Sequence, residues 1–210
     1  MGHIILLGDS IFDNARYVPG ECAVIDHLHR MLPKGWRATL LAVDGSETTT
    51  MSSQLSKVPA DASHLILSIG GNDALGCSAL ILHEPAASFR EVLTRLDGIR
   101  SEFQRSYHAV LDALLSRSKP LAVCTVYDAI PVLEAAELAG LCIFNDVILR
   151  EAFQRGLSII DLRLVCGEAE DYASTSPIEP SVAGGVKIAR AICRAVTESE
   201  GQSAGTRVFV

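Results

Sequence analysis

The sequence lacks the features of a membrane, secreted or nucleic-acid-binding protein. Its apolar runs are all much shorter than the ~18 residues that a membrane span needs. The first residues, MGHIILLG, carry no charged region and no small-residue cleavage site, so they do not resemble a secretory signal. The formal net charge of -7 opposes binding to a phosphate backbone. We therefore expect no membrane insertion and no nucleic-acid partner.

Metal and cofactor motifs are also absent. The six cysteines, at positions 22, 77, 124, 142, 166 and 193, include no Cys-x-x-Cys pair. Wide and irregular spacing of this kind favours reduced thiols over disulfides or a zinc site. Neither a P-loop nor a dinucleotide-binding glycine pattern occurs. The sequence thus implies no metal, no cofactor and a cytoplasmic location.

Five short apolar runs predict strands that are buried on both faces. They cover residues 3–8, 38–43, 64–69, 121–126 and 157–162. Helical spacing appears between and after them, in residues 24–32, 87–117, 144–155 and 182–196. Strands that alternate with helices are typical of a parallel sheet covered on both sides. We predict one domain over residues 1–198, a three-layer α/β/α sandwich with a mainly parallel five-stranded sheet, and a flexible tail over 199–210.

Polar and glycine-rich segments follow three of the predicted strands. They are GDSIFDN (8–14), DGSETTT (44–50) and GGNDALG (70–76). In open α/β sheets, ligands bind beyond the carboxyl ends of the strands. Ser10 is expected on the first of these turns, where it is either a nucleophile or a helix cap. Gly45 offers a backbone N–H that a ligand can approach closely, and Asn72 either donates into the cleft or forms an Asx turn.

The three segments are more specific together than any one is alone. A serine and three donors come from adjacent strand ends: the N–H groups of Ser10 and Gly45, and the side-chain amide of Asn72. Convergent donors of this kind stabilise the oxyanion of a tetrahedral intermediate. The sequence therefore predicts a nucleophilic Ser10 beside an oxyanion hole formed by Ser10, Gly45 and Asn72.

In order and spacing, these motifs resemble those of the SGNH (GDSL-type) hydrolases along nearly the whole chain. GDSIFDN is similar to the block that carries the nucleophile, AVDG to the block with the oxyanion-hole glycine, and GGND to the block with the asparagine. The resemblance implies a flavodoxin-like α/β/α sandwich. It also implies esterase-type activity, with a small acyl or acetyl ester as the partner molecule.

The block that carries the catalytic base in this family is altered here. The family pattern is Asp-x-x-His, followed by a glycine-rich start to the last helix, whereas this chain reads SPIEPSVAGGVKIA from position 176. Ser176 stands where the resemblance expects the aspartate, and Glu179 stands where it expects the histidine. Both the usual base and its usual orienting acid are therefore replaced.

Three interpretations of Glu179 are open from the sequence. It is the base, although a free Glu has a pKa of ~4.3 against ~6.5 for His; a helix start at Pro180 would lower this pKa and burial would raise it. Alternatively, His83 takes the proton. In the third interpretation Glu179 only caps the last helix, and the crevice binds an ester or carbohydrate without hydrolysing it.

Neighbouring residues are expected to support the site. Asp9 is predicted to tie the loops together rather than act as a base, and Ser176 to stand beside Glu179. Glu170 or Asp171 is a candidate for the missing acid. The segment 74–90, expected as a loop, and the helix after it would wall one side of the pocket, with apolar contributions from Leu75, Leu80, Ile81 and Leu82. We predict a serine esterase with catalytic Ser10 and Glu179; the alternative is a catalytically impaired binding protein.

Overall fold

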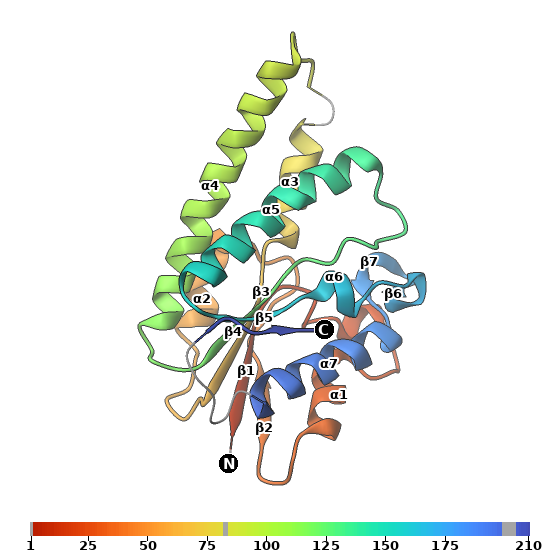
Figure 1. Cartoon of the computed structure of the whole chain (residues 1–210). Coiled ribbons are helices and arrows are strands. Elements are labelled where there is room, and N and C mark those ends of the chain that lie inside the picture. Colours follow the sequence, from red (N-terminus) through yellow and green to blue (C-terminus); the bar gives the residue numbers. More distant parts are fainter. Residues whose placement is uncertain (1, 82–83, 199–204) are drawn as a thin grey trace.

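A parallel sheet of six strands, in the order β2-β1-β3-β4-β5-β8, forms the centre of the computed structural model (Figure 1). The structure describes residues 2–81, 84–198 and 205–210. The strands are β1 (His3–Gly8), β2 (Arg37–Leu40), β3 (His64–Ser68), β4 (Leu121–Cys124), β5 (Ser158–Ile160) and β8 (Val208–Phe209). The predicted α/β class and mainly parallel sheet are confirmed, and each of the five predicted runs contains a strand.

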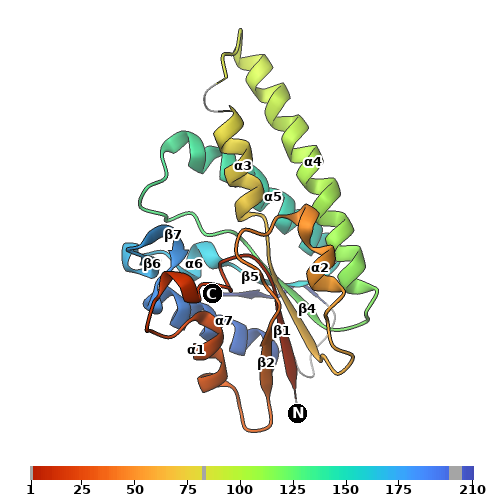
Figure 2. The ribbon, with the colours of Figure 1, turned by 180° about the vertical axis from the view of Figure 1, so that it is seen from behind.

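Helices cover both faces of this sheet. One face carries α1 (Val24–Met31) and α7 (Val182–Thr197), which lie side by side, and the other carries α2 (Ser52–Leu55), α4 (Phe89–Leu115) and α5 (Ala135–Gln154) (Figures 1 and 2). Along β1, Ile4 and Leu6 pack with the α1 and α7 side, whereas Ile5 and Leu7 pack with the α4 and α5 side. Because both faces of β1 are buried, its sequence is apolar throughout rather than alternating.

Shorter elements complete the chain between these layers. They are η1 (Ala15–Tyr17), η2 (Thr48–Thr50), α3 (Gly71–Ile81), α6 (Leu162–Val165), η3 (Ala169–Asp171), β6 (Tyr172–Ala173) and β7 (Ser176–Pro180). β6 and β7 form a separate antiparallel pair. In the described part of the chain, no helix combines the length and the apolar character that a membrane crossing requires.

The sixth strand corrects the prediction of five strands, and it places residues 208–209 of the segment predicted as a flexible tail (199–210) in the sheet. Val208 and Phe209 form β8, which runs parallel to β5 at the edge of the sheet. The N–H of Asp161 donates to the carbonyl of Phe209 at 2.9 Å, and the Phe209 side chain is only 2% exposed. Burial of this ring and the strand pairing hold the segment in place. Residues 199–204 lie outside the described part of the chain.

The segment predicted as a loop over 74–90 is helical in its first half. Helix α3 includes residues 71–81 and begins directly after β3. Figure 2 shows α3, the first turns of α4 and the first turns of α5 projecting together beyond the sheet. We call these three helix segments, α3 and the first turns of α4 and α5, the helical arm. Leu75 belongs to the helical arm, whereas the side chains of Leu80, Ile81 and Leu82 lie outside the described part of the structure.

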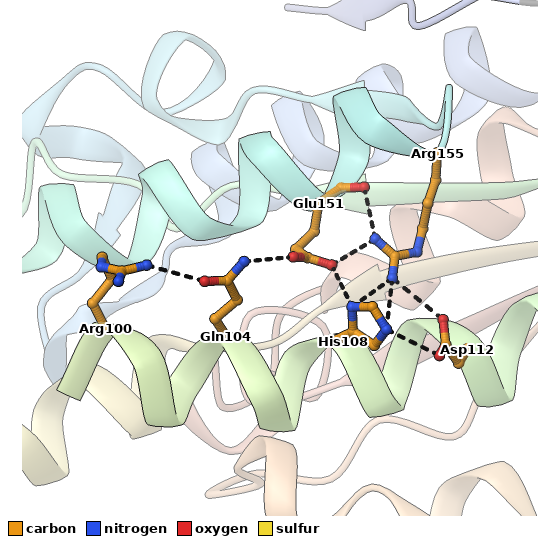
Figure 3. Close-up of polar contacts among 6 residues, drawn as sticks. All are labelled: Arg100, Gln104, His108, Asp112, Glu151 and Arg155. Atoms are coloured by element: carbon orange, nitrogen blue, oxygen red, sulfur yellow. Dashed lines mark hydrogen bonds and ion pairs between the residues drawn. The ribbon is translucent and has the colours of Figure 1, made fainter. Parts of the chain in front are cut away.

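A buried glutamate joins α4 to α5 below the helical arm (Figure 3). Glu151 of α5 is 1% exposed, and its carboxylate accepts from Gln104 at 2.9 Å and from Arg155 at 2.5 Å. His108 Nδ1 lies 3.1 Å from the same carboxylate. Burial by itself raises the pKa of Glu151, but hydrogen bonds from Gln104, Arg155 and His108 lower it below its ordinary value. Glu151 is therefore an ionised, fully engaged carboxylate.

Replacing Glu151 with Ala is expected to lower the free energy of unfolding by about 2 kcal/mol, because the change removes a buried carboxylate that accepts from the half-buried Gln104 and Arg155. The matched control is Asp146→Ala, which removes a carboxylate from an exposed pair with Arg150 on the same helix. That change is expected to cost about 0.5 kcal/mol or less. Urea unfolding of the three proteins at neutral pH measures both values, and equal costs would contradict the role given to Glu151.

Candidate active site

The strand order creates a crevice at the carboxyl ends of β1 and β3. β1 lies between β2 and β3. The chain therefore passes from β1 to β2 on one side and then crosses to β3 on the other side of β1. Doubly wound sheets bind ligands at such a switch point, beyond the carboxyl ends of the strands. Ser10 follows β1 and Asn72 follows β3, and both therefore emerge at this crevice.

Gly8 allows β1 to turn toward Ser10 at very close range to β3. Its φ is +128°, and a Cβ atom added there would lie 1.6 Å from the carbonyl oxygen of Ser68. Any side chain at this position would therefore collide with the β3 backbone. The N–H of Asp9 donates to the same oxygen at 3.1 Å. The turn that carries Ser10 is thus anchored to β3.

The side chain of Gln54 anchors the same turn from α2. Its Oε1 accepts the N–H of Gly8 at 2.8 Å, and its Nε2 donates to the carbonyl of Gly8 at 2.7 Å. The same Nε2 donates to Ser46 Oγ at 3.0 Å, which connects the turn to the loop after β2. Gln54 is 1% exposed, so its amide depends on these partners. Gln54 was not predicted as a site residue, because no sequence signal separates a buried glutamine from a solvated one in so short a helix.

The loop after β2 is joined to the first turn of α3. Asn72 Nδ2 donates to the carbonyl of Ser46 at 3.0 Å. The neighbouring Asp73 carboxylate accepts the N–H of Thr48 at 3.1 Å and its hydroxyl at 2.5 Å. An amide nitrogen has two donors, so Asn72 keeps a second N–H for the crevice.

The backbone donors predicted for an oxyanion hole are unengaged. Among the described residues, neither the N–H of Ser10 nor that of Gly45 has an acceptor. Gly45 has a φ of +78°, a conformation that favours glycine. Ser10 and Asn72 line the cavity described below, whereas Gly45 lies in the loop beside it and does not line it.

Glu179 is buried on β7 and held on both sides by its neighbours. The Tyr127 hydroxyl donates to the carbonyl of Ile178 at 2.7 Å, and Asn14 Nδ2 donates to the carbonyl of Pro180 at 3.0 Å. Asn14 belongs to the GDSIFDN segment, so this bond joins the Ser10 turn to the Glu179 strand. Asn14 lies in a recognised sequence segment, but no role was predicted for it.

The Glu179 carboxyl lies in an environment that disfavours its charge. Burial raises its pKa to about 7, a hydrogen bond with the Ser10 side chain opposes this rise, and repulsion by Asp44 adds to it. Its Oε2 atom is buried without a partner among the described residues. Glu179 therefore has a pKa near neutral pH and lines the same cavity as the predicted nucleophile.

Asp9 is a second buried carboxyl beside Ser10. Its Oδ1 accepts the N–H of Ile11 at 3.1 Å, which closes the turn around the serine. Burial raises the pKa of Asp9 to about 8; the Ile11 bond opposes the rise, and the charges of Glu179 and Asp73 add to it. Asp9 therefore carries a proton at neutral pH, and its hydrogen bond to the backbone fits the loop-tying role expected of it.

The other candidate acids and bases are engaged elsewhere or not described. Ser176 begins β7 opposite Ala173 and does not line the cavity, and residues three apart on a strand point to opposite faces. Asp171 accepts from Lys187 Nζ at 2.7 Å, and Glu170 is exposed. His83 lies outside the described residues. Within the described ranges, no group of three His, Cys, Asp or Glu side chains is suited to hold a metal ion.

A cavity of about 130 Å³ extends from Ser10 and Glu179 into the helical arm. Its polar end is formed by Asp9, Ser10, Asn72 and Glu179. Most of its remaining wall is aliphatic or aromatic and comes from α3, α4, α5 and the segment after β4: Leu75, Leu96, Ile99, Val126, Ile130, Leu133, Leu141, Ile143 and Phe144. The arrangement suits a ligand with one polar, reactive end and one apolar end.

Solved structures with the same architecture include lipases and esterases. No protein-family model and no curated protein sequence matches the chain. Among solved structures, an extracellular lipase from Streptomyces rimosus is 18% identical, with 95% of this chain and 100% of that chain covered and a TM-score of 0.67. A member of the lipolytic G-D-S-L family from Veillonella parvula is 14% identical, with 97% and 100% covered and a TM-score of 0.67.

An acetyl xylan esterase from Geobacillus stearothermophilus is similar to the same extent. It is 17% identical, with 96% of this chain and 97% of that chain covered and a TM-score of 0.67. Identities this low show a common fold rather than a common activity. The chain therefore has the α/β/α fold of these lipases and esterases, in agreement with the fold expected from its motifs.

The raised pKa of Glu179 predicts a stability effect with a definite sign. An acid whose folded-state pKa is raised stabilises the fold fully below its unfolded pKa, and this contribution is lost as the pH rises through about 7. Glu179→Gln should therefore match the native protein near pH 4 and exceed its free energy of unfolding by about 2 kcal/mol at pH 8.

Urea unfolding across this pH range measures the difference between the two proteins. Glu170→Gln, the same change at an exposed site, is the control and should show no such pH-dependent gain. An equal gain in both variants, or a gain confined to acid, would rule out a buried Glu179 that titrates near neutral pH.

Proposed function

We propose that the chain is a serine ester hydrolase of the SGNH (GDSL-type) family that acts on small acyl esters. Ser10 is the nucleophile and Glu179 is the general base. The observation that carries the proposal is that Ser10 and the buried Glu179 line the same wall of the cavity, where the Ser10 side chain lowers the raised pKa of the Glu179 carboxyl. The lipases and esterases with the same fold support it.

In the proposed reaction, the Ser10 oxygen attacks the ester carbonyl carbon while Glu179 takes the serine proton. The carbonyl oxygen becomes an oxyanion, which is stabilised by the N–H groups of Ser10 and Gly45 and by the free amide hydrogen of Asn72. Collapse of this intermediate breaks the ester bond, and protonated Glu179 gives its proton to the leaving alcohol. Water then attacks the acyl-enzyme with Glu179 as base. As the bond between the acyl carbon and the Ser10 oxygen breaks, Glu179 returns this proton to the Ser10 oxygen, which releases the acid and restores Ser10.

A carboxylate in this environment meets the requirement of a base. General-base catalysis is most efficient when the pKa of the base lies near the working pH. Burial brings the pKa of Glu179 to about 7, close to the ordinary value of a histidine. A histidine also needs an orienting acid to set its tautomer, whereas a carboxylate has two acceptor oxygens and no tautomer. Replacement of the aspartate by Ser176 is therefore consistent with replacement of the histidine by Glu179.

Asp9 assists by position. Its proton and its bond to Ile11 keep a second negative charge away from Glu179 while the Ser10 turn stays closed. If Asp9 were ionised, its charge would raise the pKa of Glu179. A smaller fraction of Glu179 would then be ionised and able to act as a base at a given pH. We assign Asp9 to positioning rather than to proton transfer.

The second candidate is a protein that binds an ester or carbohydrate without hydrolysing it. The observation in its favour is that Glu179 has no orienting acid and leaves Oε2 unpartnered among the described residues. The two candidates differ in one measurable property, the dependence of ester hydrolysis on Ser10.

A cytoplasmic location is also part of the proposal. It is supported by the six cysteines, which are all unpaired, because reduced thiols are typical of cytosolic proteins.

The activity should depend on the ionised form of Glu179. With a nitrophenyl ester as substrate, we expect kcat/KM to rise about tenfold per pH unit in acid and to level off above a midpoint near 7. Glu179→Gln should lower kcat/KM by about 10²- to 10⁴-fold and abolish this midpoint. Ser10→Ala should leave only background hydrolysis.

Glu170→Gln controls for loss of a carboxylate in the same region and should keep the native profile. An unchanged rate and midpoint in Glu179→Gln would remove Glu179 from the mechanism. Equal rates for the native protein and Ser10→Ala at every pH would instead leave only the binding function.

A further inference from the structure

The helical arm is hollow where a packed core would be expected. None of the described side chains of α3 is buried, and the first buried residue of α4 is Phe103, near the middle of that helix. Nevertheless, Leu75 of α3, Leu96 of α4 and Leu141 of α5 all line the cavity. Apolar side chains on three helices thus face a common space.

The chemistry of this space selects an aliphatic occupant over a sugar. Away from Ser10, the lining residues with polar side-chain oxygens are Ser78, Tyr127 and Glu137, and the last two already make hydrogen bonds. The Tyr127 hydroxyl donates to Ile178, and the Glu137 carboxylate accepts the N–H of Glu134 at 2.9 Å. Sugar hydroxyl groups entering here would lose water without gaining enough partners, whereas an alkyl chain would lose nothing.

The size of the space sets the length of the occupant. An apolar cavity of about 150 Å³ accommodates a benzene molecule. The cavity here, about 130 Å³, is therefore close to the volume of a chain of about six carbons. An acetyl group would leave most of it empty, and unfilled apolar space forfeits the contacts that stabilise a bound ligand.

Gly140 of α5 keeps part of this space open. It lines the cavity, and a Cβ atom added to it would have no neighbouring atom within 4 Å. It precedes Leu141 and Phe144, so it lies farther from the sheet, along the arm. About 1.5 Å of rise per helical residue puts it roughly 6 Å beyond Phe144 along the helix axis. A side chain at this position would occupy the outer half of the cavity rather than clash with the backbone.

We propose that the helical arm binds the acyl chain of the substrate, that this chain is aliphatic and of medium length, and that Gly140 sets its upper limit. This inference rests on the proposed ester hydrolysis, since it identifies the acyl side of the same substrate. It assigns the alcohol side of the ester to the open end of the crevice. Gly140 acts as a specificity-determining residue, because the acyl chain occupies the space that a side chain at this position would fill.

The test is a series of nitrophenyl esters that differ only in acyl length, from acetyl through hexanoyl to dodecanoyl. Burial of each additional methylene favours the transition state by about fourfold. For the native protein, kcat/KM should rise on the order of 100-fold from acetyl to hexanoyl and should not rise further at dodecanoyl. In Gly140→Leu, the hexanoyl-to-acetyl ratio should fall at least about tenfold.

Gly98→Leu is the matched control. Gly98 lies on α4, is exposed, has no atom within 4 Å of an added Cβ, and does not line the cavity. The control introduces the same side chain in place of a helical glycine, so it should keep the native ratio. An acetyl preference in the native protein, or an equal change of the ratio in both variants, would overturn the assignment of the arm.

A binding measurement separates this proposal from the proposed function. Hexanoate is titrated calorimetrically into the native protein, Gly140→Leu and Gly98→Leu. Weaker binding to Gly140→Leu alone supports the arm as a chain site even if no ester is hydrolysed, in which case the catalytic proposal fails by itself. Ser10-dependent hydrolysis of acetyl esters without chain-length preference or hexanoate binding would leave catalysis intact and refute the chain site.

Discussion

The buried side chain of Asn14 connects the parts of the candidate site that lie farthest apart in the sequence. It donates to the carbonyl of Pro180 and accepts the N–H of Val24, so the Ser10 turn, the start of α1 and the Glu179 strand meet at one amide. Ser10 depends on β1 for its position, whereas Glu179 sits on a two-stranded pair outside the main sheet. The contact between serine and carboxylate therefore requires a link between two separate pieces of structure, and Asn14 provides it without any charge.

Burial of carboxyl groups at this site costs folding free energy, which interactions elsewhere in the fold must offset. Two carboxyl groups, Asp9 and Glu179, are buried at this site, the charge of Glu179 raises the pKa of Asp9, and neither carboxyl has a basic partner that the structure describes. Glu151 is also buried, but its carboxylate makes hydrogen bonds with Gln104, Arg155 and His108. The contrast separates a carboxylate arranged for stability from one arranged to take up and release a proton.

The sequence predicted the parts of the molecule that depend on local pattern. Continuous apolar runs gave the central strands, and the turns after β1 and β3 gave Ser10 and Asn72, because strand ends in a parallel sheet share one edge. Gln54 and Asn14 escaped prediction, since their importance lies in distant partners rather than in their neighbours. β8 escaped for a related reason: two residues carry no periodicity, and only the packing of Phe209 identifies them as a strand. The helical start of segment 74–90 was hidden by the glycine and serine in its sequence, which favour a loop until packing decides otherwise.

The position of β8 has a consequence for how the molecule is made. β5 would be the edge of the sheet without it, with unpaired backbone groups open to pairing with another chain. The residues that cover this edge follow all the other elements in the chain. During synthesis, the sheet therefore spends its whole assembly with β5 uncovered and closes only when the last described strand arrives. Until that strand pairs, the backbone groups of β5 at this edge are open to pairing with another chain.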